Sequence, residues 1–172
     1  ERNSYCGKLK AVVWDERHKN SDILAFGTCN KIALRLTREG KITGKLDVPE
    51  PSVREATVTV YTSDGPLFVY GSGGSLVVIK LPGTYLGTIK PHKESRYVNG
   101  VELMSSCPPL VRVRTVGADR RSMAWYPVSL SDFLAKTVAE NPLSVILDVP
   151  PLANVPPGRL AGELSLGGTA YS

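Results

Sequence analysis

The sequence predicts a mainly β fold: a single-domain sandwich or barrel of short antiparallel strands, with one late helix and an extended C-terminal tail. Three observations support this prediction. Short apolar runs alternate with turn-forming residues along residues 8–116, at the spacing expected of a sandwich or barrel. Residues 129–140 have helical periodicity instead. Proline and glycine are frequent in the last residues, which favours an extended segment.

The length of the chain favours one core. With 172 residues and 42% hydrophobic side chains, it is long enough for one core and short for two, since domains commonly contain about 100–200 residues. We therefore expect a β-rich domain over residues 1–149 and a tail over residues 150–172.

The first four predicted strands span residues 8–14, 23–27, 31–37 and 41–47. In the third of them, apolar residues alternate with basic or small ones from Lys31 to Leu36. Because strand side chains point alternately to opposite faces, we expect one apolar face and one positively charged face.

A hairpin is predicted next, formed by strands at 56–62 and 66–70. Residues 57–61 alternate strictly, and Ser63-Asp64-Gly65 separates the strands with residues that tolerate positive φ. Further short strands are expected at 76–81, 85–89, 101–104 and 110–116. In the last of these, Arg112 and Arg114 should leave the sheet on the same, exposed side.

The predicted helix is amphipathic. Leu130, Phe133, Leu134 and Val138 recur at helical spacing, Ser129 can cap the first turn, and Asn141-Pro142 ends the run. Residues 143–149 can add a last strand before the proline-rich tail. We expect the helix to pack on a sheet edge or to close a barrel end.

Cysteine and hydrophobic content indicate a soluble, cytoplasmic protein without a metal or cofactor. Cys6, Cys29 and Cys107 are odd in number and widely spaced, and only His18 and His92 accompany them, so neither a disulfide framework nor a zinc site is expected. Buried free thiols in a reducing compartment are the expectation. No apolar run approaches the roughly 18 residues of a membrane helix, and residues 1–20 contain charges where a signal peptide needs apolar residues.

The segment Gly71-Ser72-Gly73-Gly74-Ser75 resembles a serine-nucleophile turn, but the residues around it do not favour an enzyme. A nucleophilic Ser72 or Ser75 would need His18 or His92 as its base, and a strand rather than a helix follows the loop. A Walker loop would need a lysine and a helix in register. We expect a hairpin or strand connection, whose backbone amides remain available for a phosphate contact.

Charge favours a polyanionic partner. Lysine and arginine outnumber aspartate and glutamate by 21 to 16, and basic side chains are grouped along the chain. If these groups meet on one surface, Tyr97 or Trp125 can stack an unpaired base, although most aromatic rings are expected in the core. The basic residues form three candidate RNA-binding groups: Lys31, Arg35, Arg38, Lys41 and Lys45; Lys93 and Arg96, beside Tyr97 and near Lys90 and His92; and Arg112, Arg114, Arg120 and Arg121.

A family resemblance extends along the chain. It is carried by Tyr5-Cys6-Gly7 before a strand, by the link Val48-Pro49-Glu50-Pro51, by residues 95–101 leading to Cys107, and by the helix at 128–140. In these features the chain resembles the amino-terminal domain of the orbivirus non-structural inclusion-body protein. The resemblance implies a β-sandwich that binds single-stranded RNA, self-associates and helps to form cytoplasmic viral inclusion bodies.

Two other function classes remain open on the sequence. One is a viral capsid, spike or matrix β-sandwich module whose partner is protein or glycan. The other is a serine hydrolase that uses the Gly71–Ser75 loop. The leading hypothesis is a non-catalytic domain that binds single-stranded RNA through basic strand faces and self-associates through exposed strand edges or the tail.

Overall fold

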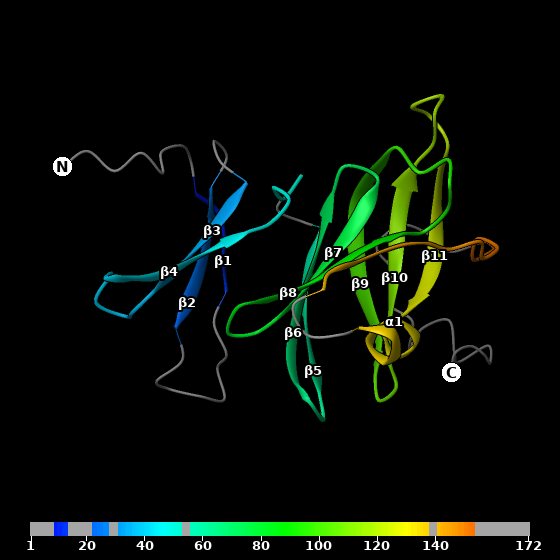
Figure 1. Ribbon diagram of the computed structural model, residues 1–172. Coiled ribbons are helices and arrows are strands. Elements are labelled where there is room, and N and C mark those ends of the chain that lie inside the picture. Colours follow the sequence, from blue (N-terminus) through cyan, green and yellow to red (C-terminus); the bar gives the residue numbers. More distant parts are fainter. Residues whose placement is uncertain (1–8, 14–21, 28–30, 53–55, 138–140, 154–172) are drawn as a thin grey trace.

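The computed structural model describes residues 9–13, 22–27, 31–52, 56–137 and 141–153 (Figure 1). These residues form three sheets of mostly antiparallel strands and one short helix. The predicted mainly β class with a late helix is confirmed. The sandwich alternative is the right one, since the described strands do not close into a barrel.

The first sheet is a four-stranded antiparallel meander in the order β1-β2-β3-β4. Each of its strands was predicted to within one residue at either end. The strands are β1 (Leu9–Val13), β2 (Ile23–Gly27), β3 (Ile32–Leu36) and β4 (Ile42–Asp47).

The second sheet contains the predicted hairpin. Thr62 pairs with Gly65 across a two-residue turn, and Gly65 has φ 117°, a backbone conformation that side chains disfavour. The order is β12-β8-β7-β6-β5, in which β12 alone runs parallel to its neighbour. The strands are β5 (Thr57–Thr62), β6 (Gly65–Ser72), β7 (Ser75–Lys80), β8 (Thr84–Lys90) and β12 (Leu143–Ile146).

The third sheet has the order β11-β10-β9, with β9 (Tyr97–Ser106), β10 (Pro109–Val116) and β11 (Met123–Ser129). Strand β11 was not predicted. Pro127 lies within it and lacks the N–H that a central strand needs, but β11 is an edge strand of its sheet, where proline is tolerated.

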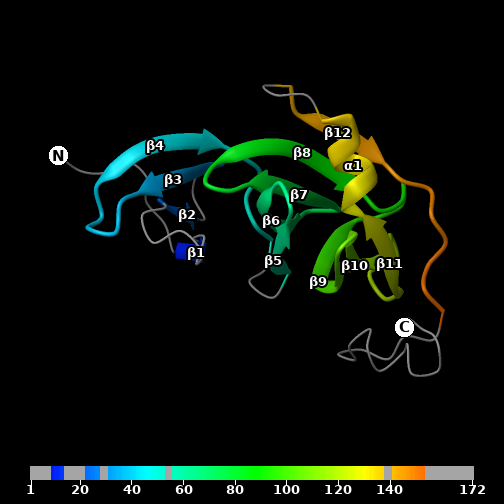
Figure 2. The same ribbon diagram turned by 90° about the horizontal axis from the view of Figure 1, so that it is seen from below.

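The second sheet lies between the other two and is buried on both faces (Figures 1 and 2). One face packs on the third sheet and the helix, through side chains such as Val69, Val78 and Val113. The opposite face packs on the first sheet, where Phe26, Phe68 and Tyr70 form a cluster of tilted and edge-to-face rings with centroids 5.2–5.5 Å apart. This double burial explains why β6 and β7 are nearly continuous apolar runs.

Helix α1 (Leu130–Lys136) is shorter than predicted. The Ser129 hydroxyl accepts a hydrogen bond of 3.4 Å from the Asp132 amide, which is the expected N-cap, and Thr137 ends the helix in extended backbone. Leu130 and Phe133 are buried between the second and third sheets. The helix thus packs into the side of the sandwich where β8 and β11 diverge (Figure 2).

Residues 143–153 run across the same opening. Leu143, Val145, Leu147 and Val149 are partly buried, whereas the alternate residues are exposed. The segment bonds to β8 through the Leu147 amide and the Lys90 carbonyl (2.8 Å) and to β11 through the Leu152 amide and the Trp125 carbonyl (2.7 Å). The start of the predicted tail is therefore docked in an extended form, and residues 154–172 lie outside the described part of the chain.

Two further findings concern predictions made from the sequence. Cys107 lies exposed in the β9–β10 turn, so the expectation of a buried thiol is wrong at this position; Cys6 and Cys29 lie outside the described residues. Within the described residues, no helix has the length and apolar character needed to cross a membrane.

Candidate nucleic-acid interface

The outer face of the third sheet carries the predicted arginine pair. Residues of β10 alternate, so that Val111 and Val113 enter the core while Arg112 and Arg114 share the other face with Trp125. The prediction that the two arginines share one side is confirmed. Their environments nevertheless differ.

Arg112 is not a surface residue. Only 1% of it is exposed, and its guanidinium carbon lies 4.2 Å from the Trp125 ring centroid. Nε donates to Glu102 Oε2 at 2.8 Å, and Nη2 donates to the same oxygen. The expectation of an exposed Arg112 is wrong, because the carboxylate and the indole ring together bury its charge.

Arg114 is half-buried on the same face. Its Nε donates to Asn99 Oδ1 at 2.9 Å and its Nη2 donates to the Asn99 carbonyl at 3.2 Å, while its guanidinium carbon lies 5.3 Å from the Trp125 ring centroid. Gly100 makes room for both side chains, since a Cβ there would lie 3.2 Å from Arg114 Cβ and 3.3 Å from the indole. Trp125 is only 5% exposed beneath these groups, so it is not placed to stack an incoming base.

The end of the third sheet brings together residues of the second and third predicted basic groups. Tyr97 pairs with Val116, and the Arg96 amide donates to the Val116 carbonyl at 3.1 Å. Arg96, Tyr97 and Arg120 line a hollow of about 590 Å³ with residues 116–118. Arg96 and Arg120 are exposed, and Tyr97 is partly exposed. Two basic groups that are separate in the sequence therefore meet at one place.

The β10–β11 loop presents Arg120 and Arg121 in a defined conformation. Asp119 Oδ1 accepts from the amides of Arg121 (3.0 Å) and Ser122 (2.9 Å), and Oδ2 accepts from the Ser122 hydroxyl. The Ser122 hydroxyl and amide and then the Arg121 amide lower the pKa of Asp119 to about 2. Arg120 has φ 61°, in the left-handed region, and its amide bonds to the Gly117 carbonyl at 3.0 Å. No described carboxylate forms an ion pair with Arg120 or Arg121.

The loop before β9 contributes Lys93. His92 positions this loop: its ring stacks on Tyr126 at 4.5 Å, Nε2 lies 3.1 Å from Thr115 Oγ1, and Nδ1 accepts from the Glu94 amide at 3.2 Å. Burial, and secondarily Lys90, lowers the pKa of His92, although Glu94 acts in the opposite direction. The neutral His92 ring therefore supports the loop. Lys93 is exposed in this loop, three residues before Arg96.

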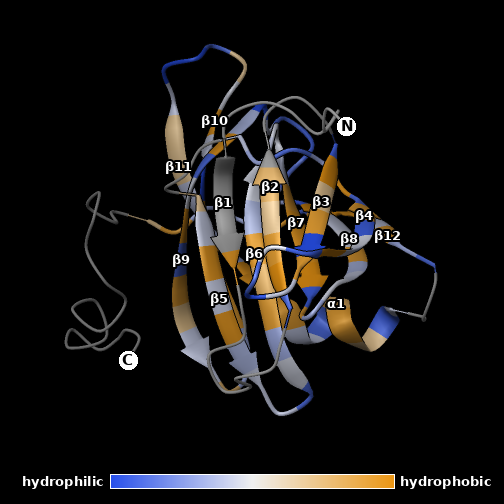
Figure 3. Cartoon of the chain, turned by 90° about the vertical axis from the view of Figure 1, so that its left-hand side faces the viewer, coloured by the Kyte–Doolittle hydropathy of each residue, from blue (hydrophilic) through white to orange (hydrophobic). Residues whose placement is uncertain are grey.

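The first basic group lies elsewhere. Lys31, Arg38, Lys41 and Lys45 are exposed and lie on β4 or beside β3 and β4. Their sheet lies on the other side of the second sheet from the third sheet (Figure 1). Arg35 points toward the second sheet, contrary to prediction: it shares a face of β3 with Ala33, which lies in the core, and its side chain packs beside Gly83. The apolar Ile32 and Leu34 alternate with them on the other face of β3. Figure 3 views the molecule from the side of the first sheet. The Arg35 guanidinium pairs with Asp22 at 3.2 Å, and the Arg35 Cδ would lie 3.1 Å from a Cβ at Gly83.

The glycine-rich loop is the expected hairpin connection. Ser72 pairs with Ser75 across Gly73-Gly74, and a strand follows. The Gly73 amide donates to Ser52 Oγ at 2.7 Å and its carbonyl accepts from the Val98 amide at 2.7 Å, so this amide is occupied and is not placed for a phosphate. His92 bonds to Thr115 and Glu94 instead of to either serine, and His18 lies outside the described residues.

No sequence pattern identified three residues that bond to the arginines of this surface or to the loop that carries them. Asn99 and Glu102 bond the guanidinium groups of Arg114 and Arg112, from which they are distant in the sequence. Asp119 instead accepts from the backbone amide of Arg121, two residues later. An Asp followed by two arginines and a serine between two strands is a recognisable turn signal. This turn signal predicts the loop, and a loop at this position implies a further strand after it, which is β11.

Comparisons with known proteins show a fold likeness. The chain matches no protein-family model and no curated protein. Among solved structures it is similar to the dihydro-heme d1 dehydrogenase NirN in complex with DHE, with a TM-score of 0.54 and 11% identity, over 90% of this chain and 29% of that chain. The chain thus spans less than a third of the length of that structure, and at this identity the likeness shows fold alone.

Proposed function

We propose that this chain is a non-catalytic domain that binds single-stranded RNA at the end of its third sheet and self-associates, as the orbivirus resemblance implies for an RNA-recruiting scaffold in the cytoplasm. The observation that carries the proposal is the convergence of Arg96, Tyr97 and Arg120 around one hollow, with Arg121 beside it. Arg112, which is buried and paired, has no part in it.

The chemistry of the hollow suits an unpaired nucleotide. Its arginines have no described ion-pair partner and can each contact a phosphate, which releases counterions. The partly exposed Tyr97 ring offers a face on which a base can stack, a contact that contributes about 1–3 kcal/mol. A base can reach a tyrosine only when it is unstacked and unpaired, so the surface favours single strands.

A salt titration of binding to a labelled, unstructured single-stranded oligonucleotide tests the proposal. With three arginine contacts, the logarithm of the association constant should fall with the logarithm of salt with a slope of about −2. The double variant Arg96→Gln/Arg120→Gln should bind about tenfold or more weakly, with a slope nearer to −1. Tyr97→Ala should lower affinity without changing the slope.

The matched control is Arg38→Gln/Lys41→Gln, which removes the same charge from the first sheet. Its affinity should stay within about twofold of the wild-type value, because those side chains lie far from the hollow and exposed charges act weakly beyond the Debye length of about 10 Å. Equal losses in the two double variants, or an affinity indifferent to salt, would reject the proposed surface.

A further inference from the structure

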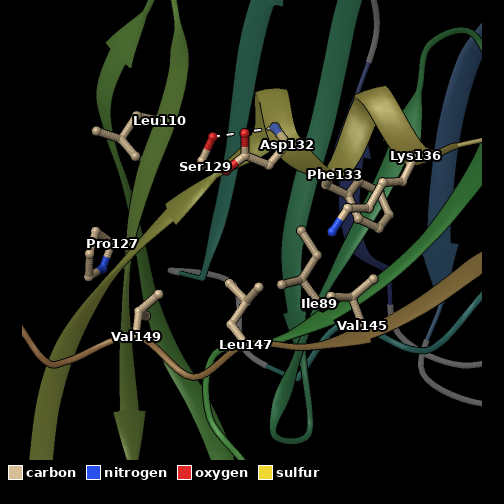
Figure 4. Close-up of a pocket in the computed structure, with 10 residues that line it drawn as sticks. All are labelled: Ile89, Leu110, Pro127, Ser129, Asp132, Phe133, Lys136, Val145, Leu147 and Val149. Carbon is tan, nitrogen blue, oxygen red and sulfur yellow. Dashed lines mark hydrogen bonds between the residues drawn. The ribbon is translucent and has the colours of Figure 1, made fainter.

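The side of the sandwich closed by α1 contains a cavity of about 240 Å³ (Figure 4). It exists because the second and third sheets lie close together at β5 and β9 but diverge toward β8 and β11 (Figure 2). The helix and the docked segment 143–153 span this opening without filling it. The cavity therefore lies between β8, β10, β11, the helix and segment 143–153.

The walls of the cavity are apolar. Ile89 of β8, Phe133 of the helix and Leu147 and Val149 of the docked segment point into it from different sides, and Leu110 and Pro127 close it on the third sheet (Figure 4). An apolar pocket of this kind favours an apolar ligand, because its walls offer water few hydrogen-bond partners.

The polar groups of the cavity lie on the helix. Lys136 is exposed, yet its side chain runs beside the Phe133 ring with its nitrogen directed toward Ile89 (Figure 4). No described carboxylate forms an ion pair with it, although Asp132 stands one helical turn earlier. The Asp132 carboxylate lies at the opposite end of the helix, beside the cap residue Ser129 (Figure 4).

We propose that this cavity binds an unbranched aliphatic carboxylate, with its chain among Ile89, Leu147 and Val149 and its carboxylate on the Lys136 ammonium. Since a cavity of about 150 Å³ holds benzene, this one suits a saturated chain of roughly eight carbons. The charge at the mouth favours the headgroup: the Lys136 ammonium, which has no ion-pair partner among the described residues, attracts an anion, and the apolar interior retains the chain. This site lies apart from the hollow at Arg96 and Arg120, with which it shares no lining residue.

The test is a calorimetric titration of the full chain with octanoate, octanol and octylammonium, accompanied by the methyl NMR signals of the cavity residues. Octanoate should bind saturably with 1:1 stoichiometry and shift the methyl signals of Leu147 and Val149. Octanol should bind about fivefold more weakly and octylammonium weaker still, because a partly exposed charge pair contributes up to about 1 kcal/mol.

Two variants separate the chain site from the headgroup site. Val149→Phe places a ring in the cavity and should abolish binding of both octanoate and octanol. Lys136→Gln should weaken octanoate about fivefold and leave octanol unchanged. Lys41→Gln, an exposed lysine of the first sheet, is the matched control and should change neither.

Absence of saturable octanoate binding to the wild-type chain would overturn the proposal, as would binding that survives Val149→Phe. If Val149→Phe lowers the midpoint of thermal unfolding, Val145→Phe is used in its place, because Val145 of β12 lines the same cavity. If Lys136→Gln lowered the affinities for octanoate and octanol equally, the assignment of Lys136 to the carboxylate would be contradicted.

Discussion

At the scale of single residues, the third sheet shows how position decides what an arginine does. Arg112 and Arg114 are two residues apart on the same face, yet one is buried against Glu102 and Trp125 while the other bonds Asn99 at the margin. Arg120 is held in a left-handed turn by backbone bonds and is exposed. The same side chain therefore supports the sheet at one position and offers charge at another.

Arg112→Glu should destabilise the domain severely. The substitution places a carboxylate against the Glu102 carboxylate in a buried setting, and removing one partner of such a pair costs about 3–5 kcal/mol. Arg114→Gln, the control, should cost about 1 kcal/mol, since it removes two hydrogen bonds at a partly exposed site. Urea unfolding measures both. An Arg112→Glu variant within 1 kcal/mol of the wild type would show that the pair contributes little to stability.

At the scale of elements, the β6–β7 hairpin is positioned by close backbone packing on the segment that leads into β9. A Cβ at Gly74 would lie 2.2 Å from the Ser95 carbonyl oxygen, and the Ser95 hydroxyl donates to the Gly74 carbonyl at 2.7 Å. Ser95 directly precedes Arg96. The glycines that resemble a catalytic loop in the sequence thus serve to support the start of the proposed RNA surface.

Gly74→Ala should destabilise more than Gly73→Ala. At Gly74 the new methyl group must displace the Ser95 backbone, and overpacking of this kind typically costs about 1–3 kcal/mol or more. At Gly73 nothing lies within 4 Å of a Cβ, so only the strain of φ 54° remains, about 1–2 kcal/mol. Thermal unfolding of the two variants, with RNA affinity measured in parallel, compares them. A Gly74→Ala variant that keeps wild-type stability and affinity would show that the segment before Arg96 moves freely.

At the scale of the whole molecule, three stacked sheets leave strand edges at their margins. Strand β4 bonds to β3 on one side only within the described residues, and Ile42 on it is 40% exposed. An unpaired edge with an exposed apolar side chain is a site for association with a second strand. The proposed self-association is therefore expected to use this edge.

Ile42→Glu should shift the domain toward the monomer. A charge on the edge strand opposes pairing with another copy, and surface substitutions of this kind usually change stability by less than about 0.5 kcal/mol. Sedimentation velocity over a range of concentrations measures the effect. Ile146→Glu, at a position 63% exposed on β12, is the control. Dissociation by Ile146→Glu instead would move the interface to the second sheet.

The sequence by itself determined every described strand except β11, the Asp64-Gly65 hairpin, the capped helix and the shared face of Arg112 and Arg114. These features follow from side-chain period and local turn chemistry, which act over a few residues. Only the tertiary structure decided which face of each strand is buried. Packing of the second sheet on both sides turned Arg35 inward, and Trp125 and Glu102 buried Arg112. The meeting of Arg96 with Arg120, and the cavity beneath α1, depend in the same way on how distant segments approach one another, which no local pattern specifies.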